Sequence, residues 1–115
     1  MANTFKVVTK AGVTSADVIY TAGSGVTAIV LGLILGNTTT SQITSTVTLT
    51  SDTSSRAGAN NEDNQAVELI TDAPIPAGSS LGLLSGNKVV LETTDTISVT
   101  GSGATDVALS IMEIT

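Results

Sequence analysis

Cysteine, histidine and tryptophan are absent from the 115 residues, and only two side chains are aromatic, Phe5 and Tyr20. Without cysteine and histidine there is no disulfide, no thiol chemistry, no imidazole catalysis and none of the usual zinc ligands. With so few aromatic residues, the usual anchors of a sugar or small-ligand pocket are missing too. The composition therefore predicts a protein without catalytic residues, cofactor or metal ion.

Positive charge is also scarce. Four basic residues (Lys6, Lys10, Arg56 and Lys88) stand against ten acidic ones, which gives a net charge of −6. Nucleic acids and anionic membranes attract basic patches, so we expect neither as a partner. Residues 1–10 contain no apolar signal-peptide core, so we expect synthesis in a cytoplasm without Sec export.

One apolar run, residues 26–37 (VTAIVLGLILGN), is the centre of the expected fold. It is much shorter than the roughly 18 to 20 apolar residues that cross a bilayer as a helix. Its β-branched residues and flanking glycines favour a strand over a helix. We therefore predict a central strand with both faces covered by protein.

Elsewhere apolar residues alternate with the 20 threonines and 13 serines, which is typical of strands with one face in water. We expect about nine short strands, at 3–9, 17–21, 26–37, 43–50, 65–71, 79–84, 89–92, 96–100 and 106–115. Pro74 and Pro76 predict a corner or an edge. Gly86-Asn87 indicates a two-residue hairpin turn.

Short strands separated by frequent turn signals predict an all-β fold, with residues 1–115 forming a single antiparallel β-sandwich. The sequence leaves immunoglobulin-like and jelly-roll-like wiring open, and we favour the former. The expected core residues are Ile29, Leu31, Leu33, Leu35, Val47, Leu49, Val89, Leu91, Ile97, Val99, Leu109 and Ile111. The threonines at alternate positions of 43–50 are interpreted as a solvated sheet face, in preference to an ice- or sugar-binding ladder.

Residues 51–65 form the longest segment without apolar periodicity, which predicts a loop that faces solvent or a partner. Its acidic residues could be read as a cation site, but their spacing matches no Ca²⁺ loop. We include Arg56, Asn60 and Asn61 as interface candidates, since arginine is enriched at interface hot spots. Asn37-Thr38-Thr39 matches a glycosylation pattern and is interpreted as a polar strand end.

Four segments carry a family resemblance: MANTFK at the start, IYTAGSGVTAIVLGLILGN, PIPAGSSLGLLSGNKVVLETTDTISVT and the closing ALSIMEIT. Together they resemble a family of small virion proteins of tailed phages, common in phages of cyanobacteria and other marine bacteria. The resemblance covers most of the chain outside residues 51–65. It implies a non-enzymatic structural protein of the virion, made in the host bacterial cytoplasm, either a capsid cement (decoration) protein or a tail, neck or baseplate component.

The two ends of the chain carry more apolar surface than a small sandwich needs, with Phe5, Val7 and Val8 at the start and both faces of residues 107–114 at the finish. Among them, Phe5, Val7, Met112 and Ile114 are our interface candidates. Large apolar patches seldom stay exposed on a stable monomer. We therefore expect a homo-oligomer, a trimer or another cyclic ring, that docks onto the major capsid protein or other virion proteins. The alternative is a small module that binds a receptor or carbohydrate. The enzyme class hardest to exclude is a glycoside hydrolase, which needs two carboxylates about 5 to 10 Å apart in a cleft.

Overall fold

The described residues form nine strands, in agreement with the prediction of about nine. The computed structural model describes residues 2–51, 65–84 and 88–115. The strands are β1 (Asn3–Val13), β2 (Asp17–Thr21), β3 (Thr27–Asn37), β4 (Ile43–Thr50), β5 (Ala66–Ile75), β6 (Ser80–Leu83), β7 (Val89–Leu91), β8 (Thr96–Gly101) and β9 (Thr105–Ile114).

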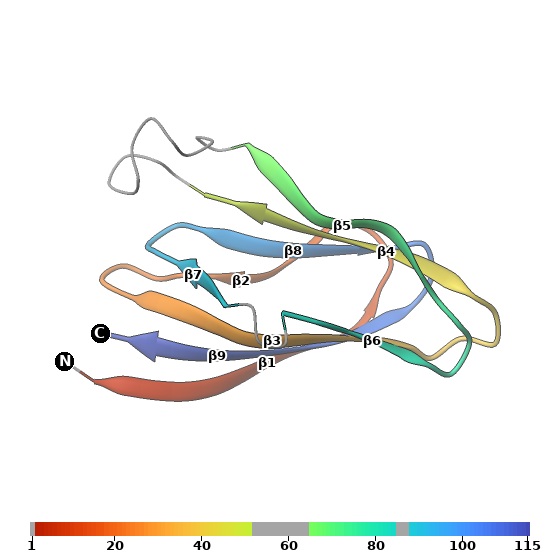
Figure 1. Ribbon diagram of the computed structural model, residues 1–115, viewed down its shortest axis with the longest axis horizontal. Helices are drawn as coiled ribbons and strands as arrows, with labels where there is room; N and C mark the ends of the chain where they lie inside the picture. Colours follow the sequence, from red (N-terminus) through yellow and green to blue (C-terminus); the bar gives the residue numbers. More distant parts are fainter. Residues whose placement is uncertain (1, 52–64, 85–87) are drawn as a thin grey trace.

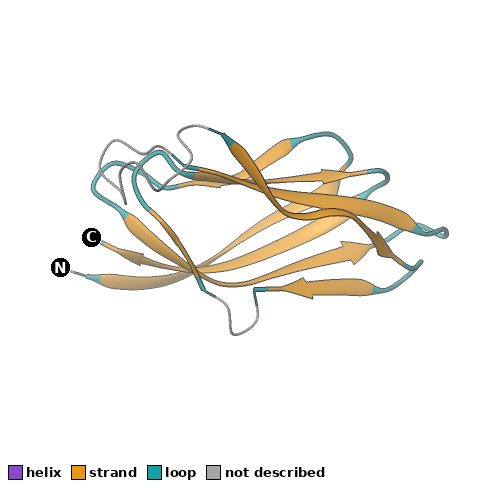
Figure 2. Cartoon of the chain, turned by 45° about the horizontal axis from the view of Figure 1, so that its top comes forward, coloured by secondary structure: helices purple, strands orange, loops and turns teal. Residues whose placement is uncertain are grey.

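The strands form two antiparallel sheets that face each other (Figure 1). Sheet A has the order β1-β9-β3-β6, with β7 also paired to β3, and sheet B has the order β2-β8-β4-β5. The view in Figure 2 shows the same two layers without a helix among the described residues. The two ends of the chain lie side by side, since Ala2 and Thr115 exchange backbone hydrogen bonds of 3.1 and 3.0 Å.

The wiring is that of a jelly roll. The first half of the chain pairs with the second half in mirror order: β1 with β9, β2 with β8, β3 with β6 and β7, and β4 with β5. This is the pattern of one long folded hairpin wrapped into a double sheet. The all-β sandwich is thus confirmed, whereas the preference for immunoglobulin-like wiring was wrong. Local alternation specifies the faces of a strand but not the strand that it pairs with.

The core lies between the sheets and consists of aliphatic side chains from both. Of the expected core residues, the following are buried: Leu33, Leu35, Val47, Leu91, Ile97, Val99, Leu109 and Ile111. Leu49 and Val89 are partly buried and pack against this cluster.

Ile29 and Leu31 are exceptions, because β3 contains a β-bulge between Val30 and Gly32. One extra residue in a strand reverses the alternation of faces beyond it. Ala28 and Val30 therefore face the core before the bulge, and Leu33 and Leu35 after it. The expectation that Ile29 and Leu31 belong to the core assumed a regular strand and was wrong.

Two other expectations about chain path need correction. Strands β6 and β7 do not pair with each other as a hairpin would require; both pair with β3, β6 against 33–36 and β7 against 28–30. The turn residues Gly86 and Asn87 lie outside the described residues. Strand β1 is also longer than expected, because it continues through a register shift to Val13. The expected edge is confirmed, since Pro74 lies in β5, an edge strand of sheet B.

Asn37 closes one end of the sandwich. Its side chain is buried; Nδ2 donates to the carbonyl oxygens of Ser41 at 2.8 Å and Ile75 at 2.9 Å, and Oδ1 accepts from Thr39 N–H at 2.8 Å. These bonds connect the end of β3 to the loop that follows and to the end of β5. The glycosylation pattern here is therefore a structural strand end, as the sequence predicts.

Gly101 occupies the most confined glycine position near the same end of the sandwich. A Cβ atom at Gly101 would lie 2.8 Å from the carbonyl oxygens of Gly103 and Val13, closer than real Cβ atoms approach such groups. The backbone packing here thus requires glycine.

Candidate functional site

The outer face of sheet A, which points away from sheet B, carries a row of apolar side chains. Residues directly opposite each other on paired strands point to the same side of a sheet. Phe5 pairs with Met112, Met112 with Ile29, and Ile29 with Val90, so these four residues form one row across β1, β9, β3 and β7. We name this row the ridge.

The side chains of this face are unusually exposed for their size. Phe5 is 71% exposed, Val7 63%, Val90 57% and Ile34 54%. These are four of the six large apolar side chains that are exposed in the described part of the chain, and all four lie on one face. Because they are clustered, they make this face a candidate contact surface, whereas scattered exposed residues would need no explanation.

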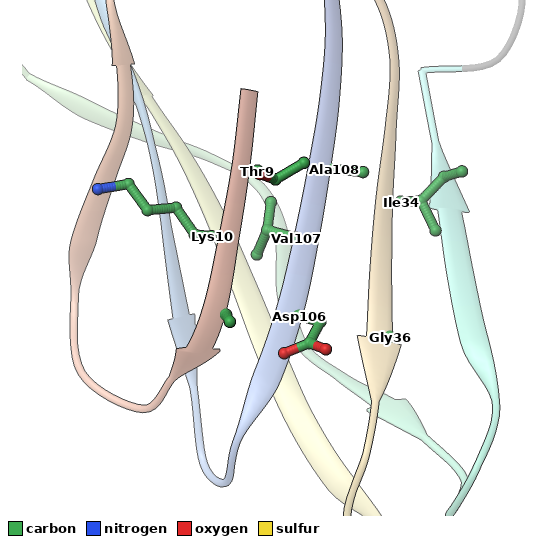
Figure 3. Close-up of a pocket in the computed structure, with 8 residues that line it drawn as sticks. Thr9, Lys10, Ile34, Gly36, Asp106, Val107 and Ala108 are labelled. Atoms are coloured by element: carbon green, nitrogen blue, oxygen red, sulfur yellow. The ribbon is translucent and has the colours of Figure 1, made fainter. Parts of the chain in front are cut away.

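Beside the ridge the same face is hollowed. Thr9 pairs with Ala108, Ala108 with Ile34 and Ile34 with Gly82, so they form a second row, parallel to the ridge. An open pocket of about 370 Å³ lies over this row and extends to Gly36 and Asp106, and Figure 3 shows Thr9, Ala108 and Ile34 side by side across their strands. We name this region the hollow. Two of its lining residues, Ala108 and Gly36, have a small side chain or none.

The outer face of sheet B has the opposite character. Thr46 pairs with Thr100, Thr48 with Ser98, and Thr50 with Thr96, and the hydroxyls of Thr48 and Ser98 are hydrogen-bonded to each other. Hydroxyl-bearing residues of this kind suit a sheet face in water. The sandwich thus has a mainly apolar outer face on sheet A and a hydroxyl-rich outer face on sheet B, where Val18, which pairs with Ser98, is an exposed apolar side chain.

A polar cluster holds the edge strand β1 against the rest of the sandwich. Tyr20 of β2 donates its hydroxyl to Glu113 Oε2 of β9 at 2.6 Å, and Lys6 Nζ of β1 lies 2.7 Å from Glu113 Oε1. The Lys6 ammonium and the Tyr20 hydroxyl hold the pKa of Glu113 below its usual range. Burial, with the neighbouring carboxylate adding to it, raises the pKa of Tyr20. This cluster connects the two sheets across the open edge.

The hollow does not bring together a pair of carboxylates. Asp106 is the acidic residue that lines it, and its Oδ1 accepts the backbone N–H of Gly12 at 3.0 Å. In the part of the chain that the structure describes, no three acidic side chains are grouped to hold a metal ion. No helix within residues 2–51, 65–84 and 88–115 is long and apolar enough to cross a membrane.

No protein-family model matches the chain, and no curated protein matches it. A chain from a solved structure entitled "Bacillus endospore appendages form a novel family of disulfide-linked pili" is similar with a TM-score of 0.48 and 15% identity, over 99% of this chain and 87% of that chain.

The structure brings together four of the interface residues proposed from sequence. Phe5, Val7, Met112 and Ile114 all lie on the outer face of sheet A. Arg56, Asn60 and Asn61 lie outside the described residues, so they stay predictions. Sequence reasoning missed Ile29, Ile34 and Val90 as members of this face. Val90 had a usable signal, because Val89 and Leu91 beside it were assigned to the core.

Proposed function

We propose that the chain is a non-enzymatic structural protein of a tailed-phage particle, a capsid cement protein that stabilises the shell through subunit contacts. The resemblance of four segments to small virion proteins supports the proposal that the chain is part of a phage particle. The observation that carries the structural role is the uncovered apolar face of sheet A, with Phe5 and Val7 exposed by 71% and 63%. A face of this kind is suited to burial against protein.

The outer faces of sheets A and B suit this role in different ways. The apolar face of sheet A supplies contact area, whereas the hydroxyl-rich face of sheet B stays hydrated. Charged residues make up 12% of the chain, so few ion pairs need desolvation in a close contact. A position in the tail, neck or baseplate would use the same faces at lower copy number.

Counting copies in purified particles tests the proposal. A cement protein is expected at a copy number close to that of the major capsid protein, with label spread over the whole shell. A tail or neck component is expected at far fewer copies, with label confined to one vertex. Absence of the chain from purified particles would overturn the virion role and leave a small binding module as the better hypothesis.

A further inference from the structure

The shape of the apolar outer face of sheet A indicates which molecule covers it. We propose that two copies of the chain pair face to face through the outer faces of sheet A, with the ridge of each copy seated in the hollow of the other. The inference rests on the proposed structural role, because it names what covers the contact face of that role.

The ridge and the hollow lie symmetrically about a middle row. Val7 pairs with Ser110 and Ser110 with Gly32, between the row of Phe5 and the row of Thr9. Two residues along β1 separate each of these rows from the next, which is about 7 Å at the usual rise of a strand. The ridge and the row of Thr9, Ala108 and Ile34, which lines the hollow, are thus displaced equally and oppositely from Val7–Ser110–Gly32.

This arrangement is self-complementary under a two-fold rotation. An axis that lies between the two faces, along the middle row, superposes the ridge of each copy on the hollow of the other. Met112 of one copy then lies over Ala108 of the second, and Val90 lies over Gly82. A flexible methionine is well suited to fill an irregular pocket. Ser110 and Gly32 on the axis are small, so the two sheets can approach closely.

The two-fold symmetry of the proposed contact also determines the number of copies in the assembly. A single face that complements itself closes after two copies, whereas a ring of three needs two different surfaces on each copy. We therefore propose a two-fold pair in place of the trimer expected from sequence. Asp106, at the far end of the hollow, falls at opposite ends of the contact in the two copies, so the two carboxylates do not meet.

The face is large enough for a stable pair. Strand β1 has 11 residues, and at about 3.3 Å per residue and about 4.8 Å per strand, four strands cover roughly 700 Å². A standard protein interface buries about 800 Å² on each partner. The pairing would leave the hydroxyl-rich faces of both sheets B outward, available to water or to other virion proteins.

The test measures the molecular mass of the purified chain in solution, for the parent and for variants that fill the hollow or truncate the ridge. Light scattering after size exclusion should give twice the chain mass of 11.4 kDa. Ala108→Phe adds apolar surface, so it would strengthen a non-specific hydrophobic contact. In the proposed pair, the phenylalanine fills the hollow and excludes the ridge of the second copy, so this variant should be monomeric. Phe5→Ala should raise the dissociation constant about tenfold or more, as for a truncated aromatic anchor. Thr100→Phe, on the outer face of sheet B, is the matched control and should stay paired.

A cross-linking experiment is independent of variants that alter packing. The chain has no cysteine, so Ser110→Cys introduces a single thiol close to the proposed axis. A short bifunctional thiol reagent should link two copies of this variant efficiently and should not link Thr100→Cys.

Each outcome decides the inference. A monomer or a trimer as the parent state, an Ala108→Phe variant that pairs as well as the parent, or equal cross-linking at both cysteine positions would overturn it. A monomer that is still present in particles would point to a shell protein as the occupant of the face. A two-fold pair that is absent from particles would instead overturn the virion role and retain the pairing.

Discussion

Leu33 and Ile34 are neighbours in β3 that face opposite sides of sheet A, and they provide a matched test of the strand assignment. Leu33 is 1% exposed and packs in the core, whereas Ile34 is 54% exposed on the outer face. Leu33→Asp and Ile34→Asp introduce the same charge one residue apart. We expect the first to prevent folding and the second to leave a folded chain.

The magnitude follows from burial. Loss of a core leucine side chain costs about 2 to 5 kcal/mol. An unpaired carboxylate in the same place costs several kcal/mol more, because the surrounding side chains are aliphatic. The sum is comparable to the whole stability of a small domain, about 5 to 15 kcal/mol. At Ile34 the carboxylate points to water, where substitutions usually change stability by only about 0.5 kcal/mol.

Circular dichroism during urea titration measures both variants against the parent. Ile34→Asp should unfold cooperatively as a monomer, since its charge lies in the hollow, and its midpoint should fall below that of the parent only by the contribution of pairing. Leu33→Asp should be insoluble or show no cooperative transition. A soluble Leu33→Asp with the parent midpoint would refute the inward orientation of Leu33, and with it the bulge that reverses the faces of β3.

Three further predictions address the remaining structural features. Asn37→Ala removes a buried side chain that satisfies two backbone carbonyls, and each group left unpaired costs about 1 to 3 kcal/mol. Thermal unfolding should therefore show a loss of stability of about 3 kcal/mol. The control Asn3→Ala, at an exposed strand end, should show no loss. Gly101→Ala forces a Cβ atom against two backbone carbonyls and should lower the stability by at least about 1 to 3 kcal/mol. At Gly23 the added Cβ atom would have its nearest neighbour at 3.9 Å, an ordinary contact, so Gly23→Ala should leave the stability unchanged. Equal stabilities of the two variants would contradict the close packing at Gly101. The lowered pKa of Glu113 contributes stability above the unfolded-state pKa of about 4.3, and this stability is lost as the pH falls through the folded pKa. Glu113→Gln should therefore be less stable than the parent at neutral pH, and the difference should shrink in acid; a constant difference would show that the carboxylate charge plays no part.

Much of the fold could be predicted because the alternation of apolar and hydroxyl-bearing residues is regular in most strands. The predicted bounds of β2 and β4 agree with the structure at both ends. Alternation fails where the backbone is irregular, as at the bulge between Val30 and Gly32. The available signal was Gly32 itself, since a glycine inside a strand often marks a bulge. It also carries no information on pairing, which is why the jelly-roll wiring was not recognised.

The candidate face could be predicted only in part. Phe5 and Met112 stood out because they lie at the chain ends, where apolar residues had no role in the expected core. Ile29 lies in the unbroken apolar run, and that run was interpreted as a strand covered on both faces. Within one chain β3 is covered on its inner face alone, and Ile34 remains exposed on the other side. The sequence predicts that both faces of this strand are covered, and the cover of the outer face by a second copy is our proposal.

The two outer faces of the sandwich indicate that the apolar face is not a requirement of sheet formation. Threonine has a high β-propensity like isoleucine and valine. On the outer face of sheet B, the central strands β4 and β8 carry threonine and serine in the rows of Thr46, Thr48 and Thr50, and Val18 lies at the edge. Threonine at Ile29, Ile34 or Val90 would therefore suit the sheet of an isolated chain equally well, at less risk of aggregation. Large apolar side chains at these positions bring an advantage only when the face is covered. The contrast between the two faces thus argues for a contact through sheet A, and a second copy of the chain is the partner that we propose for it.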